Sequence, residues 1–276
     1  MRIPIAVCSI ALVFAGVAMA QSRRDEIKKI TADYDNAEQA FGKKYSEAKT
    51  DDERAQILKT DQPDPAKWTA KLWEVINTDA KDEAALDGLI WIGTHMSGQD
   101  QKKAIDLLST NHVKSESIGD VCTQLRQPSP ENEAFMRKVL EENPNASAQG
   151  KACYALAKLL VEAKEAKESL GGERGKSLEQ YYGKPTVDWL KGLDSGDVQS
   201  DIEELFERCE ADFANVEYMK NYKTVGQLAK GDLFEIQNLQ IGKTAPEITG
   251  KDQDGNEFKL SDYRGKVVVI DFWGYW

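Results

Sequence analysis

The sequence predicts a mainly α-helical protein: a helical bundle or solenoid-like region, followed by a β-hairpin and a central strand, the first β-elements of an incomplete α/β domain. Three observations support this. From Ser22 to about Gln240, apolar residues recur at steps of three and four, the spacing of one helix face. No β-rich run precedes residue 241. From Ile241 onward, turn residues and a run of β-branched residues replace the helical pattern.

The composition fits a folded protein of one or two domains. The chain has 276 residues, of which 41% are hydrophobic and 30% charged, so it is neither disordered nor a polytopic membrane protein. Its formal net charge of −11 argues against nucleic acid as a partner, because phosphate binding needs clustered Lys and Arg. Four cysteines are too few for a disulfide scaffold of this size.

Residues 1–20 have the pattern of a secretory signal peptide. Met1-Arg2 precedes an apolar run from Ile5 to Val17, and Ala18-Met19-Ala20 has the small-x-small pattern of a cleavage site. The run is shorter than the roughly 20 apolar residues of a spanning helix, which disfavours an uncleaved membrane anchor. Lipid attachment at Cys8 is disfavoured because no apolar stretch precedes it. We expect cleavage after Ala20 and an exported chain with no stable membrane span.

Helix-starting and helix-breaking residues divide the region 21–240. Asp64-Pro65 predicts a helix start with Asp64 as the N-cap and Pro65 as the first helical residue. Ser129-Pro130-Glu131 predicts another start, and Asn143-Pro144 ends that helix. A further helix is expected over 146–168, and Gly171-Gly172 to Gly175 breaks the pattern after it. The apolar positions along the region include Ile27, Ile30, Tyr34, Ala37, Phe41, Tyr45 and Ala48, then Trp68, Leu72 and Ile76, then Phe135 and Val139, then Cys153, Leu156 and Leu160, then Tyr181, Tyr182 and Trp189, then Ile202, Leu205, Phe206, Cys209 and Phe213, and finally Val225, Leu228 and Ile236.

Several helices with short connections predict paired antiparallel helices, as in a bundle or an α-solenoid. No fixed period with recurring residues is present, so a tetratricopeptide-type array is only an analogy of shape. A packed helical domain over 21–240 is therefore favoured over a peptide-binding solenoid.

The three cysteines of this region, Cys122, Cys153 and Cys209, each lie on an apolar stripe. Buried free Cys behaves as a small hydrophobe, and the chain has neither a C-x-x-C pair nor a metal-ligand spacing. Core thiols are therefore the favoured interpretation. The alternative that two of them pair in an oxidising compartment stays open.

The other polar and aromatic candidates in this region give no catalytic constellation. His95 and His112, the only histidines, have no adjacent acidic ligands that would indicate zinc or a general base. The alternating charges of Glu162 to Glu168 predict a solvated helix face. The tryptophans Trp68, Trp73 and Trp91, at helical spacing, are expected in the core rather than in a groove.

Residues 241–276 follow a different pattern. Gly242-Lys243-Thr244-Ala245-Pro246 is a cluster of breakers. Two short β-prone stretches flank the turn pair Asp254-Gly255, which predicts a β-hairpin. Ser261 to Lys266 is expected to form a turn or a short helical hook. The run Val267–Trp273 then predicts a strand buried on both faces, as in the centre of an α/β sheet.

This segment resembles the start of the redoxin branch of the thioredoxin fold, the AhpC/TSA and TlpA-like thiol-disulfide oxidoreductases. The matching residues are Gly242-x-x-Ala245-Pro246, the Asp254-Gly255 hairpin, Leu260 to Lys266, and Val267 through Phe272-Trp273-x-x-Trp276. Bacterial TlpA-like proteins also place an exported helical region before a redoxin domain. The resemblance therefore implies a thioredoxin-like domain beginning at 241 and a location in the periplasm or cell envelope of a bacterium.

In this family the residue after the second Trp is the first Cys of a C-x-x-C pair. A helix N-terminus lowers the pKa of that Cys, which makes it nucleophilic near neutral pH, and the second Cys resolves the mixed disulfide. The sequence ends at Trp276. The resemblance thus implies truncation just before the motif, by an artificial or assembly boundary, a frameshift or nonsense mutation, or a UGA selenocysteine codon read as stop. The residues expected to flank the site are Pro246, Asp271, Phe272, Trp273 and Trp276.

Two functions are compatible with the sequence. The first is an exported thiol-disulfide oxidoreductase or peroxide-reducing redoxin, here without its redox cysteines and therefore inactive as it stands. The alternative is an exported helical interaction or scaffold protein with a decayed redoxin domain. Neither implies a cofactor, a metal or nucleic acid. The implied partners are thiol or disulfide proteins, or a thioredoxin-like reductant if the domain is completed.

Overall fold

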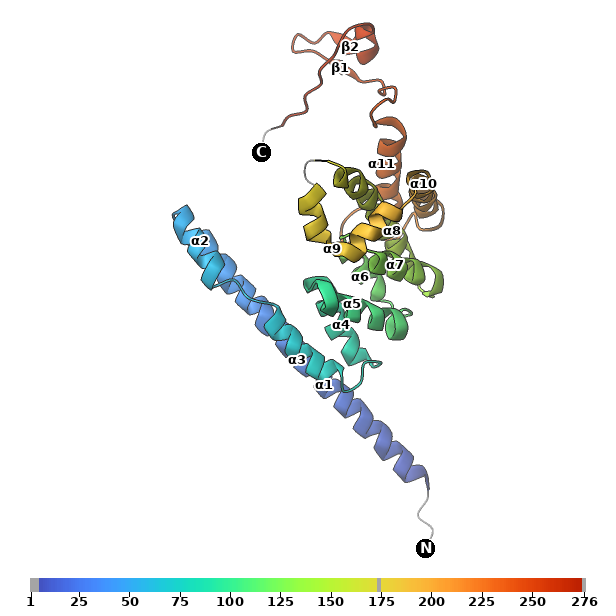
Figure 1. Ribbon diagram of the computed structural model, residues 1–276. Coiled ribbons are helices and arrows are strands. Elements are labelled where there is room, and N and C mark those ends of the chain that lie inside the picture. Colours follow the sequence, from blue (N-terminus) through green and yellow to red (C-terminus); the bar gives the residue numbers. More distant parts are fainter. Residues whose placement is uncertain (1–4, 173–174, 275–276) are drawn as a thin grey trace.

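A computed structural model describes residues 5–172 and 175–274. These residues form a helical body with one long helix along its side, and the β-hairpin lies beyond the last helix, far from the start of the chain (Figure 1). Before residue 241, the described part of the chain contains only one isolated β-bridge, between Glu217 and Thr224. The prediction of a mainly α protein followed by a hairpin is confirmed.

Most of the helices are joined by short connections. They are α1 (Ile5–Glu47), α2 (Asp51–Thr60), α3 (Ala66–Ile76), α4 (Glu83–His95), α5 (Gly98–Leu107), α6 (Ile118–Gln124), α7 (Pro130–Glu142), α8 (Ala146–Leu170), α9 (Gly175–Gly192), α10 (Ser195–Asp212) and α11 (Val225–Asn238). A π-helical turn, Leu108–His112, continues α5. The hairpin strands are β1 (Thr249–Lys251) and β2 (Glu257–Lys259), and a 3-10 turn, Leu260–Tyr263, follows β2.

Local capping explains why several helices start where they do. The Ser129 hydroxyl accepts a hydrogen bond from the Asn132 backbone N–H at 3.1 Å, and Pro130 is the first helical residue of α7, as predicted. At α3 the prediction is wrong by one residue: Pro65 occupies the N-cap position instead of the first helical position. The Asp64 carboxylate accepts a hydrogen bond from the Ala66 backbone N–H at 3.0 Å.

The glycine-rich break is only partly as predicted. Helix α8 ends at Leu170, before Gly171 and Gly172, but Gly175 is the first residue of α9 rather than part of the break. The sharp bend of this region lies at Gly183, whose φ of 73° interrupts α9 two residues before Pro185. Only glycine adopts this backbone conformation without strain, and the proline cannot continue the hydrogen-bond ladder.

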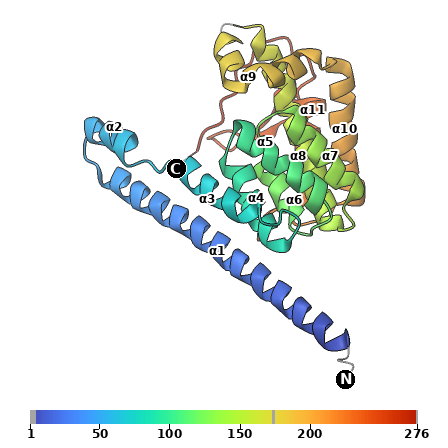
Figure 2. The ribbon, with the colours of Figure 1, turned by 60° about the horizontal axis from the view of Figure 1, so that its bottom comes forward.

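Helix α1 begins before the body and runs past one side of it, with α3 and α4 beside it (Figure 2). Ile27 and Ile30 of α1 are buried in the main core. The expected cleavage position after Ala20 lies inside this helix, whereas Met1-Arg2 lies outside the described residues. Within residues 5–172 and 175–274, no helix has both the length and the apolar character needed to cross a membrane.

Helix α8 is the centre of the body and packs against α6, α7, α9, α10 and α11. The large side chains Phe135 of α7 and Phe206 of α10 are fully buried in the same continuous core. Small residues allow the helices to approach closely. At Gly119 of α6, an added Cβ would lie 2.6 Å from the Ala148 Cα of α8. No residue larger than glycine therefore fits at this crossing unless the two helices move apart.

Candidate functional site

The hairpin of the C-terminal segment is formed by local hydrogen bonds. Strands β1 and β2 pair antiparallel with Gly250 opposite Phe258. The Asp252 carboxylate closes the turn by accepting hydrogen bonds from the backbone N–H groups of Asp254 (2.9 Å) and Asn256 (2.8 Å). Hydrogen bonds from Asn256 lower the pKa of Asp252. Gly255, with φ of 85°, supplies the left-handed conformation of the turn, so the Asp254-Gly255 hairpin prediction is confirmed.

The predicted hook after β2 is a 3-10 turn tied back to the start of the segment. The Ser261 backbone N–H donates to the Glu247 carboxylate at 3.0 Å, and hydrogen bonds from Ser261 lower the pKa of Glu247. The Lys259 backbone N–H donates to the Asp262 carboxylate at 2.9 Å. Gly265, with φ of 82°, ends the hook. The segment 247–265 thus holds its shape through hydrogen bonds that its own sequence provides.

The predicted central strand does not form in the structure. Residues 267–274 have neither helical nor strand pairing, and Val267, Val269 and Phe272 are 96%, 90% and 83% exposed. The prediction of a buried strand at Val267–Trp273 is therefore corrected. A strand of this type needs a hydrogen-bonded neighbour and apolar cover on both faces. Among the described residues, β1 and β2 pair only with each other, and the apolar side chains of 267–273 are exposed.

The residues expected to flank the redox motif are not gathered into a site. Pro246 is half-buried before β1, whereas Asp271, Phe272 and Trp273 are exposed on the segment that forms neither helix nor strand. Trp276 lies outside the described residues. Their roles stay predictions, because the surroundings that the family resemblance implies for them are not present in the described part of the chain.

The three helical-region cysteines are core residues, as predicted. Cys122, Cys153 and Cys209 are all free and buried. Burial raises the pKa of the Cys122 thiol far above its ordinary value. The pKa of Cys209 is also raised, by its hydrogen bond to Cys153 and by burial. Thiols of this kind are poor nucleophiles at neutral pH, so none of the three resembles a redox-active cysteine.

Both histidines make contacts within the helical body. The His112 ring Nε2 lies 2.9 Å from the Ala80 carbonyl oxygen. The His95 ring stacks on Trp91 at 4.5 Å between centroids, and the edge of Tyr34 meets both rings. Within the described residues, no group of three or more His, Cys, Asp or Glu side chains is arranged to hold a metal ion.

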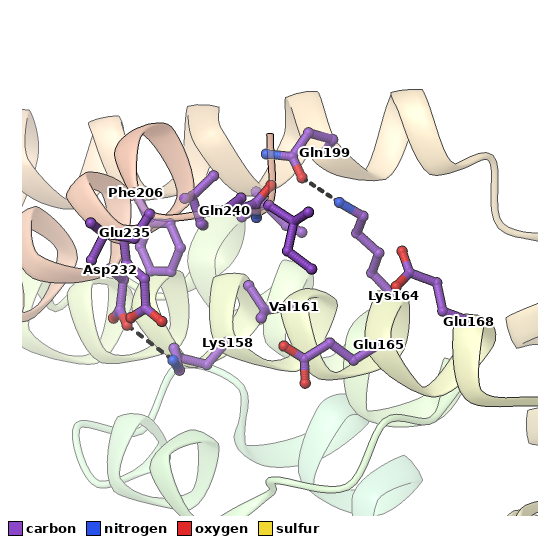
Figure 3. A pocket seen from close by; sticks show the side chains of 14 residues that line it. Lys158, Val161, Lys164, Glu165, Glu168, Gln199, Phe206, Asp232, Glu235 and Gln240 are labelled. Carbon is purple, nitrogen blue, oxygen red and sulfur yellow. Dashed lines mark hydrogen bonds and ion pairs between the residues drawn. The ribbon is translucent and has the colours of Figure 1, made fainter. Parts of the chain in front are cut away.

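A groove of about 530 Å³ lies between α8, α10 and α11 (Figure 3). The apolar part of its lining comes from all three helices and from the residue that caps α11: Val161, Ile202, Phe206, Ile236 and Leu239. Gln240 and Ile241 also line it, so the groove ends where the C-terminal segment begins.

Charged side chains border this groove at both ends. At one end, Asp232 accepts hydrogen bonds from the Tyr154 hydroxyl (2.6 Å) and the Lys158 Nζ (3.0 Å). Burial and the Asp232 hydrogen bond raise the pKa of Tyr154. At the other end, the Lys164 Nζ donates to Gln199 at 2.8 Å. The lining of the groove thus combines apolar side chains with charged ones, as ligand-binding surfaces do.

Sequence reasoning missed this groove. Glu165 and Glu168 belong to the alternating-charge run and are exposed, as predicted, but they also form one wall of the groove. Its other walls come from α10 and α11, far along the chain. The spacing of residues along one helix cannot reveal a surface that three helices form together.

Comparisons with known proteins single out the C-terminal segment. Residues 241–276 match the model of the AhpC/TSA family. The thiol-disulfide oxidoreductase ResA of Geobacillus kaustophilus is 53% identical over 38 residues, which are 14% of this chain and 22% of that protein. The protein of the same name from Geobacillus thermodenitrificans is 50% identical over the same shares. In Bacillus anthracis, the identity is 39% over 49 residues, 18% of this chain and 28% of the relative.

The similarity is therefore strong but short. The chain spans about a fifth of the length of the Geobacillus relatives that it matches. No solved structure gives a significant match to the chain.

Proposed function

We propose that the chain belongs to an exported thiol-disulfide oxidoreductase, because residues 241–276 match the AhpC/TSA family of redoxins. The observation that carries the proposal is the family match over 241–276, together with 53% identity to a ResA protein in the same short stretch. The hairpin and the hook support it, because they are the first elements that such a domain requires.

The reaction we propose is thiol-disulfide exchange at a C-x-x-C pair that follows Trp276 in the complete domain. A thiolate there attacks a disulfide sulfur of the substrate, and the second cysteine then displaces the reduced substrate. The 276 residues contain no C-x-x-C pair, so this chain by itself should not reduce a disulfide. Pro246, Asp271, Phe272, Trp273 and Trp276 would surround the pair in the complete domain, and the partners would be thiol or disulfide proteins.

The nucleotide sequence directly after codon 276 tests this proposal. We expect a Cys codon, or a UGA codon read as selenocysteine, followed by an open frame that completes a C-x-x-C-type motif. A transcribed gene that continues into intergenic sequence without such a frame would contradict the proposal.

We further propose that residues 1–20 direct export to the periplasm or cell envelope and that residues 21–240 form a separate domain. The support is the apolar run before Ala18-Met19-Ala20. Expression of the full chain in a bacterium and mass spectrometry of the envelope fraction should give a protein beginning at Gln21. A protein retained in the cytoplasm with Met1 or Arg2 at its start would refute export.

A second candidate function is an exported interaction protein that acts through the helical region. The groove of Figure 3 favours it, because an apolar floor with charged borders is the kind of surface that binds another chain. The downstream sequence separates the two candidates, since only the oxidoreductase needs a C-x-x-C pair.

A further inference from the structure

We propose that Cys153 of α8 and Cys209 of α10 form a disulfide bond, while Cys122 stays reduced. Both thiols are fully buried at the interface between these two helices. Three features of the structure support this pairing: the alignment of the two helices, the close approach of their backbones, and the position of the third cysteine.

Two contacts fix how α8 and α10 lie against each other. Near the start of α8, Gly150 lies against Phe213, the residue that caps the end of α10. Near the end of α8, the Lys164 Nζ donates to Gln199, close to the start of α10. The helices therefore run antiparallel, and moving along one means moving back along the other. The residue opposite Cys153 in this alignment is Cys209 or its immediate neighbour.

The backbones are close enough at this level for a covalent link. An added Cβ at Gly150 would lie 2.9 Å from the Phe213 Cβ, one turn away from the two cysteines. The Cys153 Sγ donates to the Leu205 carbonyl oxygen of α10 at 3.4 Å, and Leu205 is one turn before Cys209. Interaction with the Cys153 thiol also raises the pKa of Cys209. A disulfide requires Cα atoms about 4.4–6.8 Å apart, which such close helix packing allows.

Cys122 is placed elsewhere. It lies on α6, beside Tyr154 and Tyr218, in the lining of a separate cavity of about 240 Å³. Of the three possible pairings among Cys122, Cys153 and Cys209, the structure thus favours Cys153–Cys209.

Formation of the bond needs a disulfide oxidant, either glutathione disulfide or a protein disulfide. One cysteine thiolate attacks a sulfur of the oxidant and releases one reduced thiol. The second cysteine thiolate attacks the resulting mixed disulfide and releases the other reduced thiol, so two protons and two electrons leave the pair. The folded core shields both thiols, so the bond should form while the chain folds or during local opening.

In the unfolded chain a different pair of cysteines is favoured, so the test distinguishes native geometry from random pairing. Cys122 and Cys153 are closer in sequence than Cys153 and Cys209, and loop closure alone would favour the Cys122–Cys153 pair by about twofold. A dominant Cys153–Cys209 bond would therefore report native geometry rather than chance.

The experiment refolds the full, reduced chain in a buffer of reduced and oxidised glutathione, then alkylates all remaining thiols in denaturant. Peptide mapping by mass spectrometry should find the Cys153 peptide joined to the Cys209 peptide, with Cys122 alkylated. Thermal unfolding of the oxidised protein should begin several degrees above that of the reduced protein.

Two variants serve as controls. Cys122→Ser removes the uninvolved thiol and should leave the linked peptide and the thermal shift unchanged. Cys153→Ser should leave both Cys122 and Cys209 alkylated and abolish the shift. Should this variant fail to fold, Cys122→Ser alone still decides the matter, because its two remaining core thiols either link or do not. Alkylation of both Cys153 and Cys209 after refolding, or a dominant pairing that includes Cys122 or Cys8, would overturn the proposal.

Discussion

At the scale of single residues, Gly119 is the position where the packing leaves least room. An added Cβ there would lie 2.6 Å from the Ala148 Cα, which is backbone and cannot move aside as a side chain could. We predict that Gly119→Ala forces α6 away from α8 and lowers the free energy of unfolding by about 1–3 kcal/mol. Urea unfolding followed by circular dichroism measures the change.

Gly231→Ala is the matched control, because Gly231 also lies in a helix but an added Cβ there meets open space. It should raise the free energy of unfolding by about 0.5–1 kcal/mol, since glycine in a helix interior loses more conformational freedom than alanine. Equal effects of the two substitutions would show that the close approach of α6 and α8 does not limit the residue at 119.

The core thiols were predictable from the sequence because each lies on an apolar stripe of its own helix. The contact of Cys153 with Cys209 was not, since the pairing of α8 with α10 depends on the whole body. The same holds for the stack of His95 on Trp91, whose position against Tyr34 depends on how α4 meets α1.

At the scale of elements, helix starts carry a pH-dependent contribution. The Asp194 carboxylate caps α10 by accepting hydrogen bonds from the backbone N–H groups of Asp197 (3.1 Å) and Gly196 (2.8 Å), which lower the pKa of Asp194. A depressed pKa in the folded state stabilises the protein above the unfolded-state pKa of about 3.9 and ceases to do so as the pH falls through the folded value.

We predict that Asp194→Ala lowers the melting temperature at pH 7 and that the difference from the wild type shrinks as the pH falls below about 4. Asn145→Ala, which removes the cap of α8, is the control: the Asn145 amide does not titrate, so its effect should stay constant with pH. A difference at Asp194 that is the same at pH 7 and pH 3 would contradict the role of the charged cap. Differential scanning calorimetry over this pH range gives both curves.

Elements defined by neighbouring residues were predictable, whereas elements that need distant partners were not. Ser129-Pro130 starts α7, and Asp254-Gly255 forms the hairpin turn, because the hydrogen bonds involved lie within a few residues. The strand at Val267–Trp273 was wrongly predicted, since its apolar run specifies a strand only when other strands and helices cover it. The groove between α8, α10 and α11 was not predicted for a related reason: its lining comes from three helices, and no single helix defines it.

At the scale of the whole molecule, the helical body and the C-terminal segment should separate under a protease. Helix α11 ends at Asn238, and residues 239–245 are exposed and outside any helix or strand. We predict that limited proteolysis leaves a resistant core ending near residues 236–245. A first cut in the middle of α8 with 241–276 protected would contradict this boundary, and mass spectrometry of the fragments identifies the cut.

The exposed apolar run has a consequence for solubility. Val267, Val269 and Phe272 are largely exposed, and such a β-prone segment without proline favours pairing between chains. A chain ending at Gln240 should therefore be more monomeric than the chain ending at Trp276. Light scattering at matched concentration compares them, and equal monomer fractions would show that the segment does not drive association.

A chimera can test the proposal that residues 241–276 form the first part of a working redoxin domain. This segment would replace its counterpart in the ResA of Geobacillus kaustophilus, which supplies the rest of the domain. We expect this chimera to fold and to reduce a disulfide substrate at a rate comparable with that of ResA. We also expect that a second chimera with Val269→Asp, a charge in the restored central strand, loses this activity. A first chimera that folds but does not reduce the substrate, or equal activity with Asp at 269, would contradict the proposal.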